Sequence, residues 1–174
     1  MAVFPDIEIG DPVSATLLDS MLPKTYTKQA AESRNTTAVL AADGELINIP
    51  LLVGTYEIEL IILWSQVTAA PGLRTQWGFT GTYGAPVRHI IGPGATDAAP
   101  ASDAATVNLG GVSVSAPVVY RSGSTGAFCC VQEKSRAIGV TVAGNLSLTW
   151  AQQTSNPNNT TVQPGTSFKV TRLG

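Results

Sequence analysis

The stretch GTYEIELIILWSQV at residues 54–67 is the longest strongly apolar and β-branched run in the chain. Large apolar side chains recur at every second position on one face, at Tyr56, Ile58, Leu60, Ile62 and Trp64. The opposite face starts with Glu57 and Glu59 and becomes apolar at Ile61 and Leu63. A period of two predicts a strand rather than a helix. We expect a sandwich or barrel strand whose second face, from residue 61 to 63, also contacts another subunit.

The composition favours one domain with extensive contacts to neighbouring subunits. The chain has 174 residues, and a domain of this size buries roughly 70% of its unfolded surface. Its residues are 44% hydrophobic but only 13% charged, against a usual charged share of about 25%. So little charge predicts subunit or neighbour contacts over much of the surface. A net charge of -2 without a Lys/Arg cluster argues against a nucleic-acid partner.

No targeting or redox signal stands out in the sequence. The start, MAVFPDIEIGDPV, lacks a basic leader and an apolar core of signal-peptide length, and the apolar run at residues 58–64 is too short to cross a bilayer. We therefore expect synthesis in the cytoplasm and no membrane partner. The neighbours Cys129 and Cys130 would point to opposite faces of a strand, which predicts two buried or half-buried free thiols.

Residues 1–33 differ from the rest and are predicted to form an arm with one short helix. Ser14 suits an N-cap, and the helix should end before Pro23. Apolar side chains lie along both parts of this segment, at Val3, Phe4, Ile7, Ile9, Leu17, Leu18, Met21 and Leu22. One interpretation is that the helical stripe packs on the parent domain. The other is that arm and helix attach the protein to a larger assembly.

Residues 34–174 are predicted to form an all-β, jelly-roll-like antiparallel β-sandwich. Strand-like runs are separated by Gly-, Asn- and Ser-rich turns, which is typical of this fold class. The pieces at residues 36–40 and 45–49 should form a hairpin around Asp43 and Gly44. Further strands are expected at residues 73–82, 87–91, 107–109, 112–120, 127–131, 137–142, 146–152 and 167–172. Residues 92–105 read as a long exposed loop that suits either recognition or surface padding.

The sequence offers little for catalysis or metal binding. His89 is the only histidine, whereas a histidine-based metal site needs several ligands, so we expect no metal, no cofactor and no enzymatic activity. Glu57 and Glu59 share one strand face, as on a solvated sheet surface, and no nucleophile elbow or phosphate loop is present.

Aromatic side chains leave a binding surface as an alternative. Trp64 and Trp150 have apolar neighbours and are expected in the core. Trp77 and Tyr83 are the more exposed candidates for contact with a sugar or peptide.

Four segments resemble structural proteins of tailed phages that infect actinobacteria. Residues 33–64 read SRNTTAVLAADGELINIPLLVGTYEIELIILW, like the Thr-rich segment, D-x-E-L turn and G-T-Y-x-[VI]-E strand of that group. Residues 145–174, NLSLTWAQQTSNPNNTTVQPGTSFKVTRLG, are similar to its closing segment. Two further segments resemble the same group: residues 73–83, LRTQWGFTGTY, and residues 10–23, GDPVSATLLDSMLP. In the second segment, Asp19 or Ser20 stands where an Asn is expected. The loop at 92–105 falls outside the resemblance.

The resemblance implies a non-enzymatic virion protein with a jelly-roll-like knob that forms a homotrimer. We expect a surface decoration or spike protein, attached through its N-terminal arm to major capsid or tail proteins, with the capsid favoured. Three linked attachments would strengthen weak anchor contacts through effective concentration. The alternative is a tail-tip module that binds a host receptor or a host-surface glycan, with Trp77 and Tyr83 at the contact.

Overall fold

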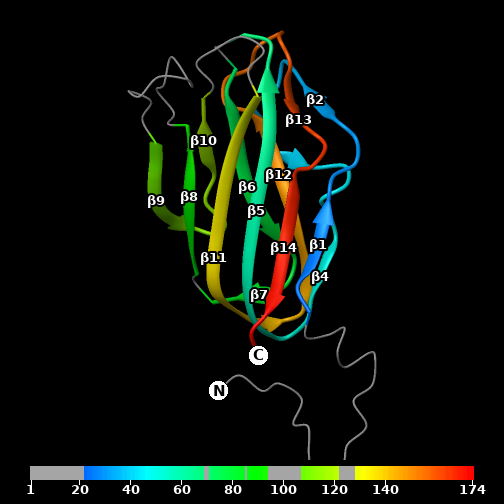
Figure 1. Ribbon diagram of the computed structural model, residues 1–174, viewed down its shortest axis with the longest axis vertical. Helices are drawn as coiled ribbons and strands as arrows, with labels where there is room; N and C mark the ends of the chain where they lie inside the picture. The colour runs from blue at the N-terminus through cyan, green and yellow to red at the C-terminus, as the bar shows by residue number, and fades with distance from the viewer. Residues whose placement is uncertain (1–21, 69–70, 85, 94–106, 122–127) are drawn as a thin grey trace, which may run out of the picture.

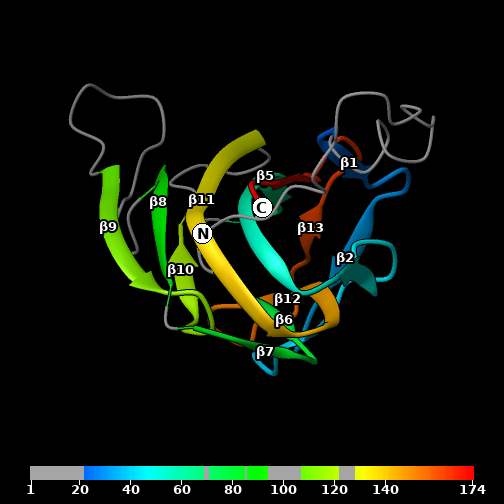
Figure 2. The ribbon, with the colours of Figure 1, turned by 90° about the horizontal axis from the view of Figure 1, so that it is seen from below.

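The protein is a sandwich of two antiparallel β-sheets. The computed structural model describes residues 22–68, 71–84, 86–93, 107–121 and 128–174, which contain fourteen strands and no helix. The nine-stranded sheet lies in front in Figure 1, and Figure 2 shows it face to face with the five-stranded sheet. The strands are β1 (Lys24–Thr27), β2 (Glu32–Arg34), β3 (Ala41–Ala42), β4 (Ile49–Leu51), β5 (Gly54–Gln66), β6 (Leu73–Phe79), β7 (Thr82–Tyr83), β8 (Val87–Pro93), β9 (Val107–Ser113), β10 (Val118–Tyr120), β11 (Phe128–Val142), β12 (Gly144–Gln152), β13 (Thr160–Val162) and β14 (Ser167–Arg172). The predicted all-β sandwich is confirmed.

Strand β5 is the central strand of the nine-stranded sheet, whose order is β1-β14-β5-β11-β8-β9. Its alternation is the one expected from the sequence, because Tyr56, Ile58, Leu60, Ile62 and Trp64 are all buried. Strand β11 pairs with it from Phe128 opposite Ser65 to Val140 opposite Gly54. The longest apolar run of the chain thus places one complete face in the core.

The five-stranded sheet, ordered β10-β6-β12-β3 with β4 also paired to β12, closes the other side of the core. Trp150 and Leu148 of β12 are buried, as predicted for Trp150. The Trp77 ring of β6 meets the Phe168 ring of β14 edge to face, with centroids 5.4 Å apart, so the two layers interlock.

Two predictions of local structure are wrong. Residues 36–40 and 45–49 do not form a hairpin, because β3 and β4 each pair with β12 instead. The segments predicted as separate strands at residues 127–131 and 137–142 are, from Phe128 on, one strand, β11, whose register shifts between Ser135 and Ile138. Ala137 has a positive φ of 55° at this bulge. The bulge interrupts the alternation that a sequence pattern detects.

The boundary of the N-terminal segment also differs from the prediction. Strands β1 and β2 pair with β14 and β13 in the nine-stranded sheet, so residues 24–33, expected in the arm, include sandwich strands. Their Lys, Thr, Glu and Arg residues carry no apolar alternation, which is why the sequence did not reveal them. The predicted helix lies outside the described residues, except for Leu22. No described helix has the length and hydropathy of a membrane span.

Candidate interaction surfaces

The outer face of the nine-stranded sheet is apolar in the half farther from the C-terminus. Strand register places Ile61 of β5 beside Gln132 of β11, which in turn lies beside Ile91 of β8. Ile61 and Ile91 are exposed. Phe128, the first residue of β11, is 75% exposed. Leu63 is half-buried on the same face. Exposed large apolar side chains that share one half of a sheet face indicate a contact surface.

The other half of this face carries polar and charged side chains in one line across four strands, and we call this line the charged row. Lys169 lies opposite Glu59, Glu59 opposite Lys134, and Lys134 opposite His89. Glu57 is next to this row and accepts ion pairs from Lys134 at 2.9 Å and Arg136 at 2.8 Å. Hydrogen bonds from Arg136 and then Lys134 lower the pKa of Glu57, so it stays ionised at neutral pH.

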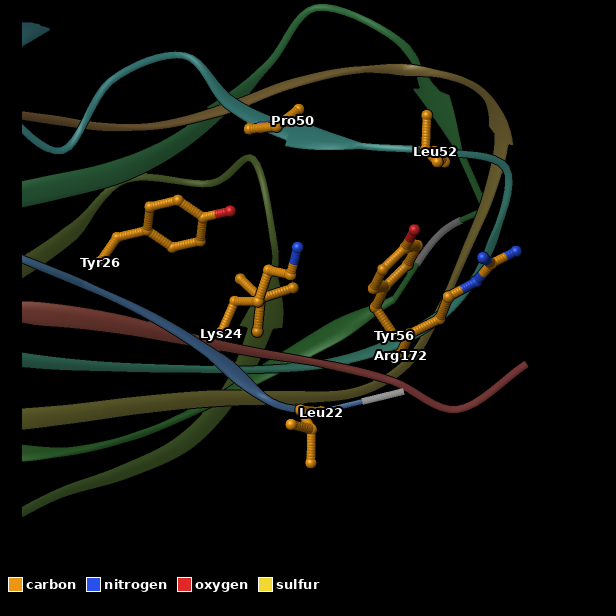
Figure 3. A pocket seen from close by; sticks show the side chains of 8 residues that line it. Leu22, Lys24, Tyr26, Pro50, Leu52, Tyr56 and Arg172 are labelled. Carbon is orange, nitrogen blue, oxygen red and sulfur yellow. The ribbon is translucent and has the colours of Figure 1, made fainter. Parts of the chain in front are cut away.

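A second candidate surface is an open groove of about 270 Å³ near the point where β1 begins and β14 ends (Figure 1). In Figure 3 the segment with Pro50 and Leu52 lies across from Lys24 and Tyr56. Eight residues from β1, β4, β5, β14 and their flanks line the groove: Leu22, Lys24, Tyr26, Pro50, Leu52, Tyr56, Val170 and Arg172. Most of this lining is apolar, with cationic side chains at Lys24 and Arg172.

Trp77 lies in the interior of the sandwich and not on a binding surface. Its side chain is 1% exposed, and its Nε1 donates to Glu133 Oε2 at 2.6 Å. The prediction of Trp77 as an exposed ligand contact is therefore wrong. The error arose because β6 turns Leu73, Thr75 and Trp77 to the core, although this face includes a polar residue.

Glu133 is the centre of a buried polar cluster that the sequence analysis missed. Its carboxylate pairs with Arg88 at 2.8 Å, and both side chains are fully buried. Thr75 Oγ1 and Tyr120 OH also donate to it, at 2.7 and 2.8 Å. Burial and the Glu133 charge raise the pKa of Tyr120, so its hydroxyl remains a donor. The donors Arg88 Nη1, Thr75 Oγ1, Tyr120 OH and Trp77 Nε1 all contact this carboxylate, and of the donor atoms in this cluster only Arg88 Nε is buried without a hydrogen-bond partner among the described residues. We assign the cluster to the core.

Asp43 is the centre of a second buried cluster, not part of a surface turn. Lys28 Nζ binds both of its oxygens at 2.9 Å, and Trp150 Nε1 donates to Oδ2 at 3.1 Å. The Leu46 and Glu45 N–H groups donate to Oδ1. Burial alone would raise the pKa of Asp43, but these hydrogen bonds and the Lys28 charge lower it below its usual value.

The remaining predicted site residues do not gather in one place. Tyr83 is half-buried against Phe79, with ring centroids 5.4 Å apart, whereas His89 is exposed on the outer sheet face. Cys129 is buried, as predicted, whereas Cys130 is exposed, so the prediction that both thiols are buried or half-buried is wrong for Cys130; no disulfide joins them. Among the described residues no cluster of three or more His, Cys, Asp or Glu could hold a metal. Of the predicted anchoring residues only Leu22 is described, and it is exposed; Val3, Phe4, Ile7, Ile9, Leu17, Leu18 and Met21 lie outside the described residues.

Comparison with known proteins adds no assignment to these surfaces. No protein-family model and no curated protein matches the chain. Among solved structures, the chain is similar to one from the structure of infectious bursal disease virus, Gx strain, at 13% identity and a TM-score of 0.19. The match covers 87% of this chain and 40% of the viral chain, so this protein spans less than half of the viral chain's length. A likeness of this size carries no argument about function.

Proposed function

We propose that this protein is a non-enzymatic structural protein of a phage virion, a trimeric surface decoration or spike. The observation that carries the proposal is the exposed apolar half of the outer sheet face, with Ile61, Ile91 and Phe128 around the half-buried Leu63. This is the part of β5 for which the sequence predicted a second subunit. The resemblance to phage structural proteins supplies the virion setting.

The chemistry of the outer face suits contact between copies of one chain. Its apolar half supplies area that is removed from water on association. The charged row beside it alternates in sign from Lys169 to Glu59 to Lys134, so a copy in the wrong register would bring like charges together. Apolar burial would thus hold the subunits together, and the charged row would fix their register.

The oligomeric state of the full-length protein tests the proposal. Light scattering should give about three times the chain mass of 18.0 kDa. Ile91→Glu and Phe128→Glu should each shift the mass towards the monomer, because a charge in the contact is costly to bury. Val39→Glu is the matched control, since Val39 is also strongly exposed but lies between β2 and β3. A wild-type monomer, or equal effects of all three changes, would refute the outer-face trimer.

Attachment through the N-terminal arm has its own test. Full-length protein and a variant without residues 1–21 would be added to virus particles that lack the protein, and bound protein would be measured after sedimentation. This deletion spares β1, which the sheet requires. We expect the full chain to sediment with the particles and the truncated chain to stay in the supernatant, with an unchanged trimer mass as the control for folding. Equal binding of both proteins would rule out arm attachment.

A further inference from the structure

The groove at the start of β1 lies between two sheet edges. Among the described strands, β1 pairs with β14 and β4 pairs with β12. Each of these two strands therefore has one edge that pairs with no other described strand. Leu52, directly after β4, is 62% exposed. Unpaired strand edges beside apolar side chains are sites where an extended segment adds to a sheet.

The groove also has a cationic rim. Arg172, whose Nη2 donates to the Val53 carbonyl at 3.0 Å, lines the groove with its positively charged side chain. Lys24 adds a second positive charge to the lining. A fitting occupant therefore combines apolar side chains with carboxylates.

The sequence of the N-terminal arm has this combination at residues 3–9, VFPDIEI. In an extended conformation, Val3, Pro5, Ile7 and Ile9 share one face, while Asp6 and Glu8 share the other. The groove volume of about 270 Å³ is below the roughly 300–1,000 Å³ of sites for drug-sized ligands, and it suits a few side chains.

Chain connectivity brings this segment to the groove at high effective concentration. The described chain begins at Leu22, which itself lines the groove. Residues 10–21 between Ile9 and Leu22 span up to about 40 Å when extended, so the segment can reach the groove of its own subunit. Tethering over so short a distance gives an effective concentration on the order of millimolar.

We propose that residues 3–9 dock in this groove of their own chain, with Ile7 and Ile9 facing its apolar lining and Asp6 and Glu8 at its cationic rim. The docking depends neither on trimer formation nor on attachment to a particle. In the free subunit it covers Ile7 and Ile9, two of the apolar side chains that the proposed function assigns to attachment.

Disulfide formation in the full-length chain tests the docking. Ile7→Cys would be combined with Leu52→Cys in the groove, in a Cys130→Ser background that removes the exposed native thiol. The control pairs Ile7→Cys with Val67→Cys, because Val67 is similarly exposed but lies about 35 Å further along the direction of β5 than Tyr56. Non-reducing electrophoresis and mass spectrometry of linked peptides would report the bonds.

We expect the Ile7–Leu52 pair to form an intramolecular disulfide at least ten times faster than the control pair, at a rate independent of protein concentration. Asp6→Lys with Glu8→Lys should slow it several-fold, whereas Asp11→Lys, outside the segment, should not. Equal rates for the two pairs would overturn the proposal. Disulfides between chains alone would also overturn it, since they would place a neighbour's arm in the groove. A monomeric protein with the fast intramolecular bond would retain the docking and reject the trimer.

Discussion

Two buried carboxylates hold segments that are far apart in the sequence. Glu133 of β11 joins Arg88 of the same sheet to Thr75, Trp77 and Tyr120 of the opposite sheet. Such a carboxylate is stable inside the protein because each oxygen accepts hydrogen bonds and a guanidinium balances the charge. Residues of this kind fix the relative position of the two layers more specifically than apolar contacts do.

Removal of Arg88 should destabilise the fold strongly. Arg88→Met leaves the Glu133 charge buried without its ion pair, and the loss of one partner from a buried pair costs about 3–5 kcal/mol. Arg136→Met is the control, because the Arg136 side chain is 76% exposed where it pairs with Glu57. That substitution should change stability by less than about 1 kcal/mol. Urea denaturation of both variants gives the comparison, and similar losses would contradict the role of the buried pair.

Asp43 should make stability depend on pH in the acid range. Its pKa is about 3.9 in an unfolded chain and lower in the folded one, so the folded state favours the ionised form. The stabilisation is complete well above pH 4 and is lost as the pH falls through the lowered folded-state pKa. Asp43→Asn, which removes the ion pair with Lys28, should cost about 3–5 kcal/mol at pH 7.

The difference in stability between wild type and Asp43→Asn should therefore shrink as the pH falls below about 4. Urea midpoints of both proteins at pH 7 and at pH 3 measure this difference. Glu57→Gln serves as a control on the surface, where screening keeps the contribution of the ion pairs small. A difference that stays constant over this pH range would show that the Asp43 charge contributes no stability.

At the scale of elements, β11 contributes side chains to three places: the apolar half of the outer face, the charged row and the buried Glu133 cluster. Its inward side chains include Val131, Glu133 and Ser135, while Cys130 and Lys134 point outward. The bulge between Ser135 and Ile138 lets one strand pair with β5 on both sides of the irregularity. The cost of this arrangement is concentrated in the positive φ of Ala137.

Ala137→Gly should stabilise the protein, because glycine adopts a φ of 55° without the steric conflict of a Cβ atom. We expect a gain of up to about 1 kcal/mol, seen as a higher Tm. Ala42→Gly in β3 is the same chemical change in a strand residue without a positive φ, and it should cost about 0.5–1 kcal/mol. A loss of stability at residue 137 as large as at residue 42 would argue against strain at the bulge.

For the molecule as a whole, the two candidate surfaces lie on different parts of the sandwich. The outer face of the nine-stranded sheet is broad and suits a second copy, whereas the groove is narrow and suits one extended segment. The first therefore concerns assembly and the second the arm. Because the two surfaces are separate, an experiment can refute the outer-face trimer without refuting the docking of the arm, and the reverse.

Cys130 can report assembly directly, because it lies beside Leu63 on the outer face and is exposed in the single chain. In the proposed trimer its thiol should react at least ten times more slowly with a thiol reagent than in the Phe128→Glu variant. Cys129 should stay unreactive in both, since it is buried until unfolding. Mass spectrometry of the labelled protein measures the rates. Equal reactivity of Cys130 in both proteins would mean that the outer face stays open.

Sequence patterns alone were sufficient to predict the fold class, the core face of β5, the core positions of Trp64 and Trp150, and the opposite orientations of Cys129 and Cys130. These features depend on alternation along one strand, which is a local property. Glu133 was within reach of the same signal, because it continues the inward period through Cys129 and Val131, but the predicted strand ended at residue 131 and so excluded it.

Four features became visible only in three dimensions: the burial of Asp43, the position of Trp77, the pairing of β3 and β4 with β12, and the groove. A buried polar side chain is tolerable when distant residues supply its partners, as Lys28 and Trp150 do for Asp43. A groove likewise exists where the edges of two sheets end beside each other. Both depend on contacts between residues far apart in the chain, which local patterns do not encode.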